Sequence, residues 1–175
     1  TYYQFLTNSR DNPERANLDN ASVVSEIHKR YIQSGANAIK TNTFGANIAV
    51  YQNAETVKAI IKAGFKIASY AAGKSCSVFA DIGPIRDEAA ADGGEYAEIV
   101  KTFAGEGAKN FLFETLPGTR GVLPAVEFIK SNIENSVVIV SFAVSQDGYT
   151  ADGEYFLRLF DKAGSAGADY TGLNC

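Results

Sequence analysis

Side chains that could do chemistry recur at the ends of apolar segments of this chain. Five such segments run over residues 34–46, 77–84, 106–118, 136–145 and 166–175. The polar, charged or thiol side chains at their ends are Asn42, Thr43, Asp81, Glu114, Thr115, Ser141, Ser145, Asn174 and Cys175. One polar residue after a strand often only caps the next helix. Five such ends in succession, with two carboxylates and a thiol, predict a convergent site.

The elements that must position these side chains are predicted to alternate between strands and helices. The five segments above are the expected strands, and in three of them a Gly-Ala pair closes the preceding helix. Apolar residues at helical spacing predict helices over residues 21–34, 55–72, 95–105, 119–131 and 153–165. Strands that alternate with helices predict right-handed crossovers and a parallel sheet.

The helix boundaries carry further expectations. Asp19 or Asn20 is expected to cap the first helix with its side chain. Pro124 must lie in the first turn of the fourth helix or kink it. Residues 1–20 are polar and aperiodic, and they are predicted to form a loop.

Two parallel architectures fit this order of elements. Five strands in 175 residues would complete an open, flavodoxin-like sheet, and the length favours it. A nucleotide-binding open sheet needs a Gly-rich or Ser/Thr-rich phosphate loop after its first strand, whereas residues 41–53 contain one Gly. The alternative is five consecutive strands of an eight-stranded barrel, which builds its site from the carboxyl ends of its strands.

Composition excludes several classes of function. With 46% hydrophobic and 21% charged residues the chain is typical of a folded globular protein. The net charge of −4, with no Lys/Arg cluster, disfavours nucleic acid as the main partner. No apolar run is long enough for a membrane span, and no signal peptide opens the chain. The two cysteines form no CxxC, which favours a reducing cytoplasm.

A set of motifs in fixed order narrows the choice of architecture. They are NLDNASVVSEIHKRYIQSGANAIKTNTFGAN, FADIGP, FLFETLPG, SFAVSQDGYTADG and GLNC, which span residues 17–175. The set resembles the homocysteine S-methyltransferase domain, the zinc-dependent barrel of cobalamin-dependent methionine synthase and its relatives. The resemblance implies an α/β fold of the (β/α)8 TIM-barrel type. Residues 1–175 would be a single incomplete domain that carries strands two to six of eight.

Under this resemblance the chain is an excerpt from a longer protein, to which further domains could belong. The N-terminal strand and the last two strand–helix units would be missing, and the lack of any Met agrees with this interpretation. In the family three cysteines hold zinc, and one belongs to a Gly-x-Asn-Cys that matches residues 172–175. Cys175 is therefore the expected zinc ligand, while the Gly-Gly-Cys-Cys that supplies the other two is absent.

The resemblance also implies the reaction. Zinc would hold homocysteine as a thiolate, which then takes a methyl group and becomes methionine. The methyl donor is unknown from this sequence, with methyltetrahydrofolate or a cobalamin-linked donor among the candidates. A lone cysteine cannot hold zinc usefully, so residues 1–175 alone are expected to be inactive.

Four residues are expected to bind the substrate. Glu114 matches the family position that accepts hydrogen bonds from the amino group of homocysteine, although it could instead pair with a nearby Lys or cap the next helix. Asn42, Thr43 and Phe44 match a motif that lines the same cavity. The alternative is strand-end capping for Asn42 and Thr43, and core packing for Phe44.

Asp81 and Asn174 are expected to contact the residues that form the site rather than the substrate or the metal. Asp81 matches a family position, but an Asx-type bond that stabilises the turn at Ile-Gly-Pro is favoured. Asn174 is expected to orient the backbone around Cys175.

The remaining reactive types are given structural roles. His28 is expected to be a packed or surface imidazole, and Cys76 an inert thiol at the stability face of the sheet. Lys40 could form a Schiff base in a barrel lyase or aldolase, or it could point outward. The alternatives to a methyltransferase are therefore that lyase and a non-catalytic open-sheet α/β binding module.

Overall fold

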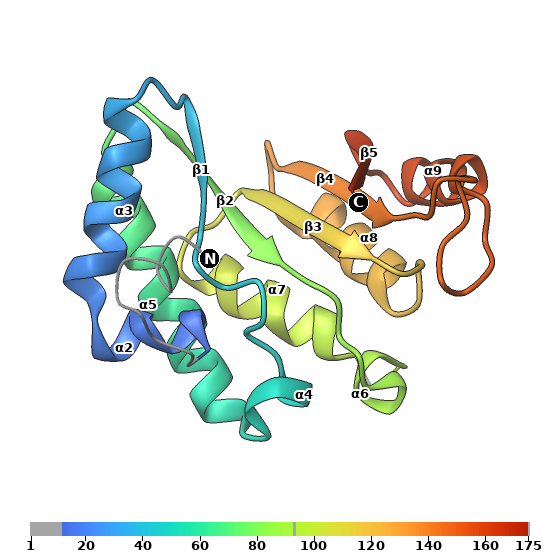
Figure 1. The fold of residues 1–175 in the computed structure, drawn as a ribbon, viewed down its shortest axis with the longest axis horizontal. Coiled ribbons are helices and arrows are strands. Elements are labelled where there is room, and N and C mark those ends of the chain that lie inside the picture. Colours follow the sequence, from blue (N-terminus) through green and yellow to red (C-terminus); the bar gives the residue numbers. More distant parts are fainter. Residues whose placement is uncertain (1–11, 93, 175) are drawn as a thin grey trace.

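Five parallel strands form one sheet in the order β1-β2-β3-β4-β5 (Figure 1). The computed structural model describes residues 12–92 and 94–174. The strands are β1 Ala38–Lys40, β2 Ser77–Ile82, β3 Asn110–Leu116, β4 Val137–Ala143 and β5 Tyr170–Asn174. Each strand pairs in parallel with the next along the chain. The five predicted strands and the α/β class are thereby confirmed.

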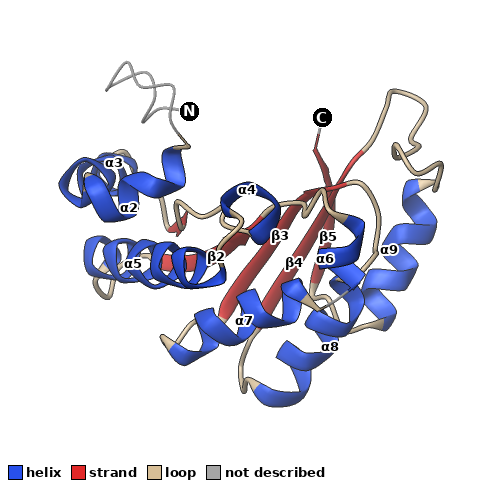
Figure 2. Ribbon diagram, turned by 90° about the horizontal axis from the view of Figure 1, so that it is seen from below, coloured by secondary structure: helices blue, strands red, loops and turns tan. Residues whose placement is uncertain are grey.

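Helices connect the strands and cover one face of the sheet. They are η1 Pro13–Arg15, α2 Ala16–Asp19, α3 Ala21–Gln33, α4 Ile48–Tyr51, α5 Ala54–Ala72, α6 Glu88–Asp92, α7 Glu95–Gly105, α8 Val122–Asn132 and α9 Phe156–Ser165. Figure 2 shows α5, α7, α8 and α9 along the same side of the sheet, while α2 and α3 lie beside α5. The five predicted helices correspond to α3, α5, α7, α8 and α9.

The two faces of the sheet differ in burial because successive side chains on a strand point to opposite sides. On β3 and β4 the residues that pack under the helices are fully buried, as Phe111, Phe113 and Phe142 show. The alternate residues, such as Leu112 and Ile139, are half-buried. One face is thus a completed core, whereas the other is covered less, as expected for part of a barrel.

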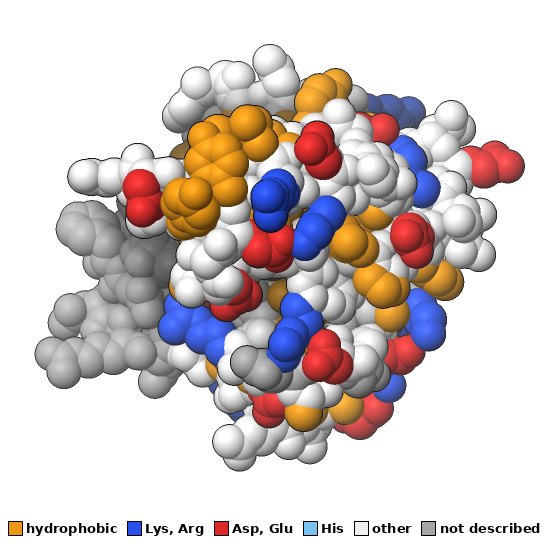
Figure 3. Space-filling view, turned by 90° about the vertical axis from the view of Figure 1, so that its right-hand side faces the viewer, with side chains coloured by type: hydrophobic (Ala, Val, Ile, Leu, Met, Phe, Trp, Pro, Cys, Tyr) orange, Lys and Arg blue, Asp and Glu red, His pale blue; other side chains and the backbone are white. Residues whose placement is uncertain are grey.

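The sheet is open at both edges among the described residues, where β1 and β5 each pair on one side only. Figure 3 shows the β5 and α9 end of the molecule, where hydrophobic side chains lie among charged ones. Large hydrophobic side chains exposed in α9, in β5 and in the loop before α9 include Tyr149, Leu157, Tyr170 and Leu173. None of the helices in the described part of the chain is long and apolar enough to span a bilayer.

The prediction of a loop over residues 1–20 is wrong where the structure describes it. Residues 1–11 lie outside the described residues, but Pro13–Arg15 form η1 and Ala16–Asp19 form α2. Buried polar contacts stabilise them: Asn17 Nδ2 donates to the carbonyl oxygens of Asn42 at 2.8 Å and Ile60 at 3.3 Å. Such long-range contacts leave no apolar periodicity in the sequence.

The two boundary expectations had different outcomes. Pro124 lies in the first turn of α8, where its missing N–H costs no helical hydrogen bond. Asn20 holds the N-cap position of α3, but its side chain makes no capping hydrogen bond. The position of the cap was therefore predicted correctly and its chemistry was not.

Candidate functional site

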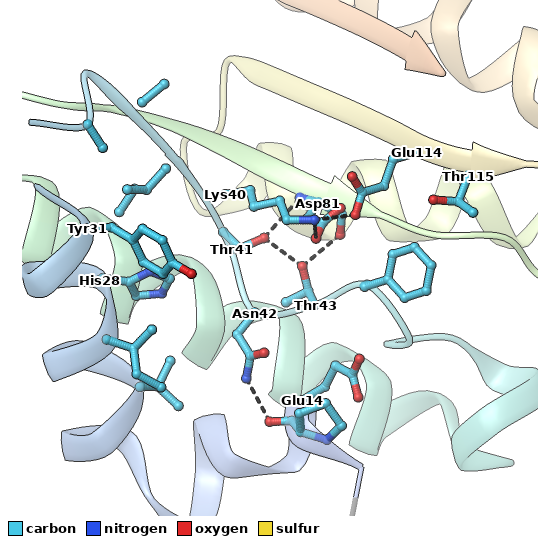
Figure 4. Close-up of a pocket in the computed structure, with 17 residues that line it drawn as sticks. Glu14, His28, Tyr31, Lys40, Thr41, Asn42, Thr43, Asp81, Glu114 and Thr115 are labelled. Carbon is cyan, nitrogen blue, oxygen red and sulfur yellow. Dashed lines mark hydrogen bonds and ion pairs between the residues drawn. The ribbon is translucent and has the colours of Figure 1, made fainter. Parts of the chain in front are cut away.

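Three charged side chains meet at the carboxyl ends of β1, β2 and β3 (Figure 4). In the register Lys40 pairs with Phe79 and Asp81 pairs with Leu112, so Lys40, Asp81 and Glu114 step along neighbouring strands by two residues each. The Lys40 ammonium donates a hydrogen bond to Glu114 Oε1, and its Nζ lies 3.2 Å from Asp81 Oδ2. We name Lys40, Asp81 and Glu114 the charged cluster.

For Glu114 the structure matches one of the alternatives given above, and for Lys40 it shows an inward ion pair that neither alternative included. Lys40 is 49% exposed along its side chain, yet its ammonium turns inward to the two carboxylates. Glu114 pairs with this lysine, which is one of the alternatives that its position leaves open. The sequence carries no local signal for this ion pair, because 74 residues separate its partners.

Burial dominates the electrostatics of Asp81. Its side chain is only 3% exposed. Burial raises the pKa of Asp81 to about 8; Lys40 lowers it and Glu114 raises it further. For Lys40, burial lowers the pKa, but the Asp81 charge and the hydrogen bond to Glu114 outweigh burial, so the pKa is raised overall. Asp81 is therefore protonated more readily than an ordinary aspartate, whereas Lys40 is held as an ammonium ion.

Asp81 also carries an unsatisfied atom. Its Oδ1 is buried and has no hydrogen-bond partner among the described residues. Its Oδ2 faces Lys40, so the carboxylate belongs to the charged cluster rather than to the turn that follows. A buried polar atom without a partner is costly and calls for an explanation, such as a ligand.

Threonine hydroxyls hold the backbone of Asp81. Thr43 Oγ1 donates to the Asp81 carbonyl at 2.7 Å, and the Asp81 N–H donates to Thr41 Oγ1 at 2.9 Å. The two hydroxyls lie 2.6 Å apart and bond to each other. Thr43 was predicted to lie at the site, while Thr41, which directly follows β1, was missed because the end of this strand was expected at Asn42 and Thr43.

A bulge in β3 aims Glu114. The register of β3 against β4 shifts between Phe113 and Leu116. Within this bulge Thr115 has φ 62°, a left-handed conformation that is strained for a β-branched residue. Asn174 holds it there: its Nδ2 donates to Thr115 Oγ1 at 2.9 Å, and the Thr115 N–H donates to its Oδ1 at 3.3 Å.

Asn174 thereby touches the residue beside Glu114. Its expected role in orienting the backbone of Cys175 stays a prediction, since Cys175 lies outside the described residues. The strained threonine gave no signal in the sequence, because Thr is typical of an ordinary strand.

Asn42 and Phe44 lie on the same pocket but are engaged in structural contacts. Asn42 Nδ2 donates to the Pro13 carbonyl at 2.7 Å, so it anchors η1. Phe44 is 38% exposed and is not a core residue. A Cβ on Gly83 would lie 2.4 Å from the Phe44 carbonyl oxygen, which explains the glycine of the Asp-Ile-Gly-Pro motif.

A pocket of about 610 Å³ joins these residues to an apolar wall. Its polar end is the charged cluster, and its other end is lined by Val24, Ile27 and Ile39 together with His28. His28 is buried, which lowers its pKa, and its Nε2 has no partner among the described residues. His28 is thus packed, as one of its two expected placements had it, but its place on a pocket wall was missed.

The described residues do not fit a zinc site by themselves. No group of three His, Cys, Asp or Glu side chains in residues 12–92 and 94–174 is placed to hold a metal ion. Cys76 is a free thiol just before β2, at the other end of that strand from Asp81. The three or four ligands that a zinc site needs are therefore not supplied by the described residues alone.

Comparisons with known proteins identify the family and the fold. A sequence model of the family described as homocysteine S-methyltransferase matches residues 4–175. The fold is similar to that of the homocysteine methyltransferase MmuM from Escherichia coli in its apo form, at TM-score 0.75 and 18% identity, over 97% of this chain and 68% of that one. The metallated form gives TM-score 0.74 and 16% identity, over 99% and 71%. A search of curated proteins found no match.

Proposed function

Because the chain belongs to the homocysteine S-methyltransferase family, we propose that its pocket binds homocysteine as the methyl acceptor and that the full-length protein converts it to methionine. One observation carries the proposal: Glu114 presents a carboxylate at the polar end of the pocket and already pairs with an ammonium group. A charge-assisted bond to the amino group of homocysteine uses the same chemistry.

The other predicted residues are assigned supporting roles. Asn42, Thr43 and Phe44 form the wall beside Glu114. Asp81 keeps Lys40 in place, and Asn174 holds the β3 bulge that aims Glu114. These residues orient the acceptor, which is the part of the reaction that the described residues can perform.

Zinc and the methyl donor complete the proposal. Cys175 would be one zinc ligand, with the others outside the described residues, and zinc would supply a deprotonated sulfur on the acceptor. Residues 1–175 alone would then form an incomplete barrel without turnover. The methyl donor is proposed to be methyltetrahydrofolate or a cobalamin-linked group, and the cytoplasm suits a thiol ligand that must stay reduced.

The charged cluster argues against the lyase alternative. A lysine that forms a Schiff base must lose its proton to become a nucleophile. Lys40 contacts two carboxylates, and its pKa is raised. It is therefore held as an ammonium ion, which cannot attack a carbonyl group.

The proposal is tested with Glu114→Gln in the full-length protein. We expect kcat/KM for homocysteine to fall about 10- to 100-fold, because one charge-assisted bond is lost. Methionine formation is measured with each candidate donor, and homocysteine affinity is measured by calorimetry.

Glu106→Gln is the matched control. The side chains of Glu106 and Glu114 are both 16% exposed and both pair with lysines, but Glu106 follows α7 and does not line the pocket. We expect its kinetics to match the unsubstituted protein. Absence of both homocysteine binding and methionine formation in the unsubstituted protein would refute the proposed function.

A further inference from the structure

The ion pair between Lys40 and Glu114 poses a problem for any substrate that carries an amino group. Glu114 is the carboxylate that the proposed function assigns to the amino group of homocysteine, yet the Lys40 ammonium already occupies it. An entering ammonium must therefore share the Glu114 carboxylate with Lys40 or displace Lys40 from it. The surroundings of Lys40 favour displacement.

Lys40 can leave Glu114 without losing every partner. Its side chain is 49% exposed, and four flexible methylene groups carry its charge. Asp81 lies on β2, between the strands of Lys40 and Glu114, and its Oδ2 is 3.2 Å from Nζ, so Lys40 keeps its contact with the Asp81 carboxyl group after it leaves Glu114. The backbone of Asp81 is fixed by Thr41 and Thr43, which makes this second anchor stable.

Charge balance limits which ligands can replace the ion pair between Lys40 and Glu114. Once Lys40 is displaced, the pocket holds a carboxylate and an ammonium that no longer neutralise each other. A substrate with a positive and a negative end restores both contacts, whereas a simple amine leaves Lys40 with less compensation. An amino acid carries both charged groups, an ammonium and a carboxylate, on its α-carbon.

We propose that Lys40 is a specificity-determining residue that binds the α-carboxylate of the methyl acceptor, while Glu114 binds its amino group. The internal ion pair opens, and the zwitterion enters between its partners. The inference rests on the proposed function, because it assigns the charged ends of the same acceptor.

Two features of the pocket support this assignment. Its volume of about 610 Å³ leaves room for a small amino acid beside the charged cluster. The buried Oδ1 of Asp81, which has no partner among the described residues, gives the incoming polar head group a further hydrogen-bonding atom. Asp81 lies at the same end of the pocket as Lys40 and Glu114 (Figure 4).

Binding of three thiols tests the contacts of the amino group and of the carboxylate separately. L-homocysteine carries both charges, 4-mercaptobutanoate lacks the amino group, and 3-aminopropanethiol lacks the carboxylate. Their dissociation constants are measured by calorimetry on the full-length protein, with equal metal content in every variant. Lys40→Met should weaken homocysteine and 4-mercaptobutanoate about 10- to 100-fold. It should not weaken 3-aminopropanethiol, because the loss of Lys40 frees Glu114 for the amino group.

Glu114→Gln provides the reciprocal test. It should weaken homocysteine and 3-aminopropanethiol but spare 4-mercaptobutanoate. The double variant Lys40→Met/Asp81→Asn removes the buried acid together with its cation, so it tests the same selectivity if Lys40→Met folds poorly. Lys66→Met is the control, because that side chain is 70% exposed and lies away from the pocket.

The outcomes distinguish the inference from the proposed function. If Lys40→Met weakens all three thiols equally, or none of them, Lys40 does not read the carboxylate and the inference is overturned. Homocysteine binding by the unsubstituted protein would still leave the proposed function standing. If the unsubstituted protein binds none of the three thiols, the proposed function fails and the inference fails with it.

Discussion

Two groups among the polar residues at the strand ends behave differently, and we name them the charged half and the neutral half. The charged half comprises Lys40, Asp81 and Glu114 on β1, β2 and β3. The neutral half comprises Thr115 and Asn174 on β3 and β5. In the neutral half each partner satisfies the other, since two hydrogen bonds join the Asn174 side chain to Thr115. In the charged half one buried oxygen of Asp81 has no partner among the described residues, and Lys40 is half exposed.

This difference separates a scaffold from a binding surface. The two hydrogen bonds between Thr115 and Asn174 fix the geometry of both side chains within the fold. A charged group that is incompletely paired and faces a pocket has free energy to gain from a ligand. Because Glu114 and Thr115 are adjacent on β3, the neutral half holds the backbone from which the charged half acts.

The largest effect that separates the halves is expected from Lys40→Met. The variant leaves the carboxyl groups of Glu114 and Asp81 without their cation, which together should cost about 2–3 kcal/mol at pH 8, less than for a fully buried pair because Lys40 is half exposed. The folded-state pKa of Asp81 is raised to about 8 from 3.8, and loss of Lys40 raises it further. The protonated acid thus stabilises the fold fully below pH 3.8, and this contribution is lost as the pH rises through 8.

The destabilisation by Lys40→Met should therefore be smaller at pH 5 than at pH 8. Urea unfolding of the full-length protein at the two pH values measures it. Lys66→Met, whose surface pair with Glu106 spans 3.3 Å, should change stability by less than about 0.5 kcal/mol at both. An equal loss at pH 5 and pH 8 would show that Asp81 does not govern the charged half.

The fold was predictable because its signals are local. The strands alternate with helices that have clear apolar periodicity, and the bounds predicted for the third helix, 95–105, are those of α7. The segment at residues 12–20 was not predictable, because buried amide and carboxylate contacts define it. Glu14, for example, is buried and accepts a hydrogen bond from the Gly45 N–H at 2.9 Å.

The location of the site was predictable from the sequence, whereas the ion pairs within it were less so. Parallel strands bring their carboxyl ends to one edge, so Thr43, Asp81 and Glu114 were expected to lie together, and they line one pocket. The inward turn of Lys40 depends on carboxylates on two other strands. A three-residue strand is too short for its alternation to show which way that lysine points.

A smaller effect is expected in the neutral half from Asn174→Ala. The variant loses two uncharged hydrogen bonds to Thr115, which should cost about 1–2 kcal/mol. Since neither partner titrates near neutral pH, the loss should be the same at pH 5 and pH 8 in urea unfolding. Asn132→Ala is the control, because its amide bonds the Phe128 carbonyl on an exposed helix end. A loss that grows with pH would place Asn174 in the charged half after all.

The smallest effect is a reversal of the usual order of Gly and Ala at Thr115. At φ 62° an alanine is strained, whereas glycine adopts this conformation freely. Thr115→Gly should therefore be more stable than Thr115→Ala by about 1 kcal/mol, although both lose the hydroxyl that Asn174 uses. Thr171 on β5 is the matched control, since it is not among the described residues with positive φ, and glycine there should be less stable than alanine. The same order at both positions would mean that Thr115 is an ordinary strand residue. The neutral half would then have no strained bulge to hold, and the aim of Glu114 would need another cause.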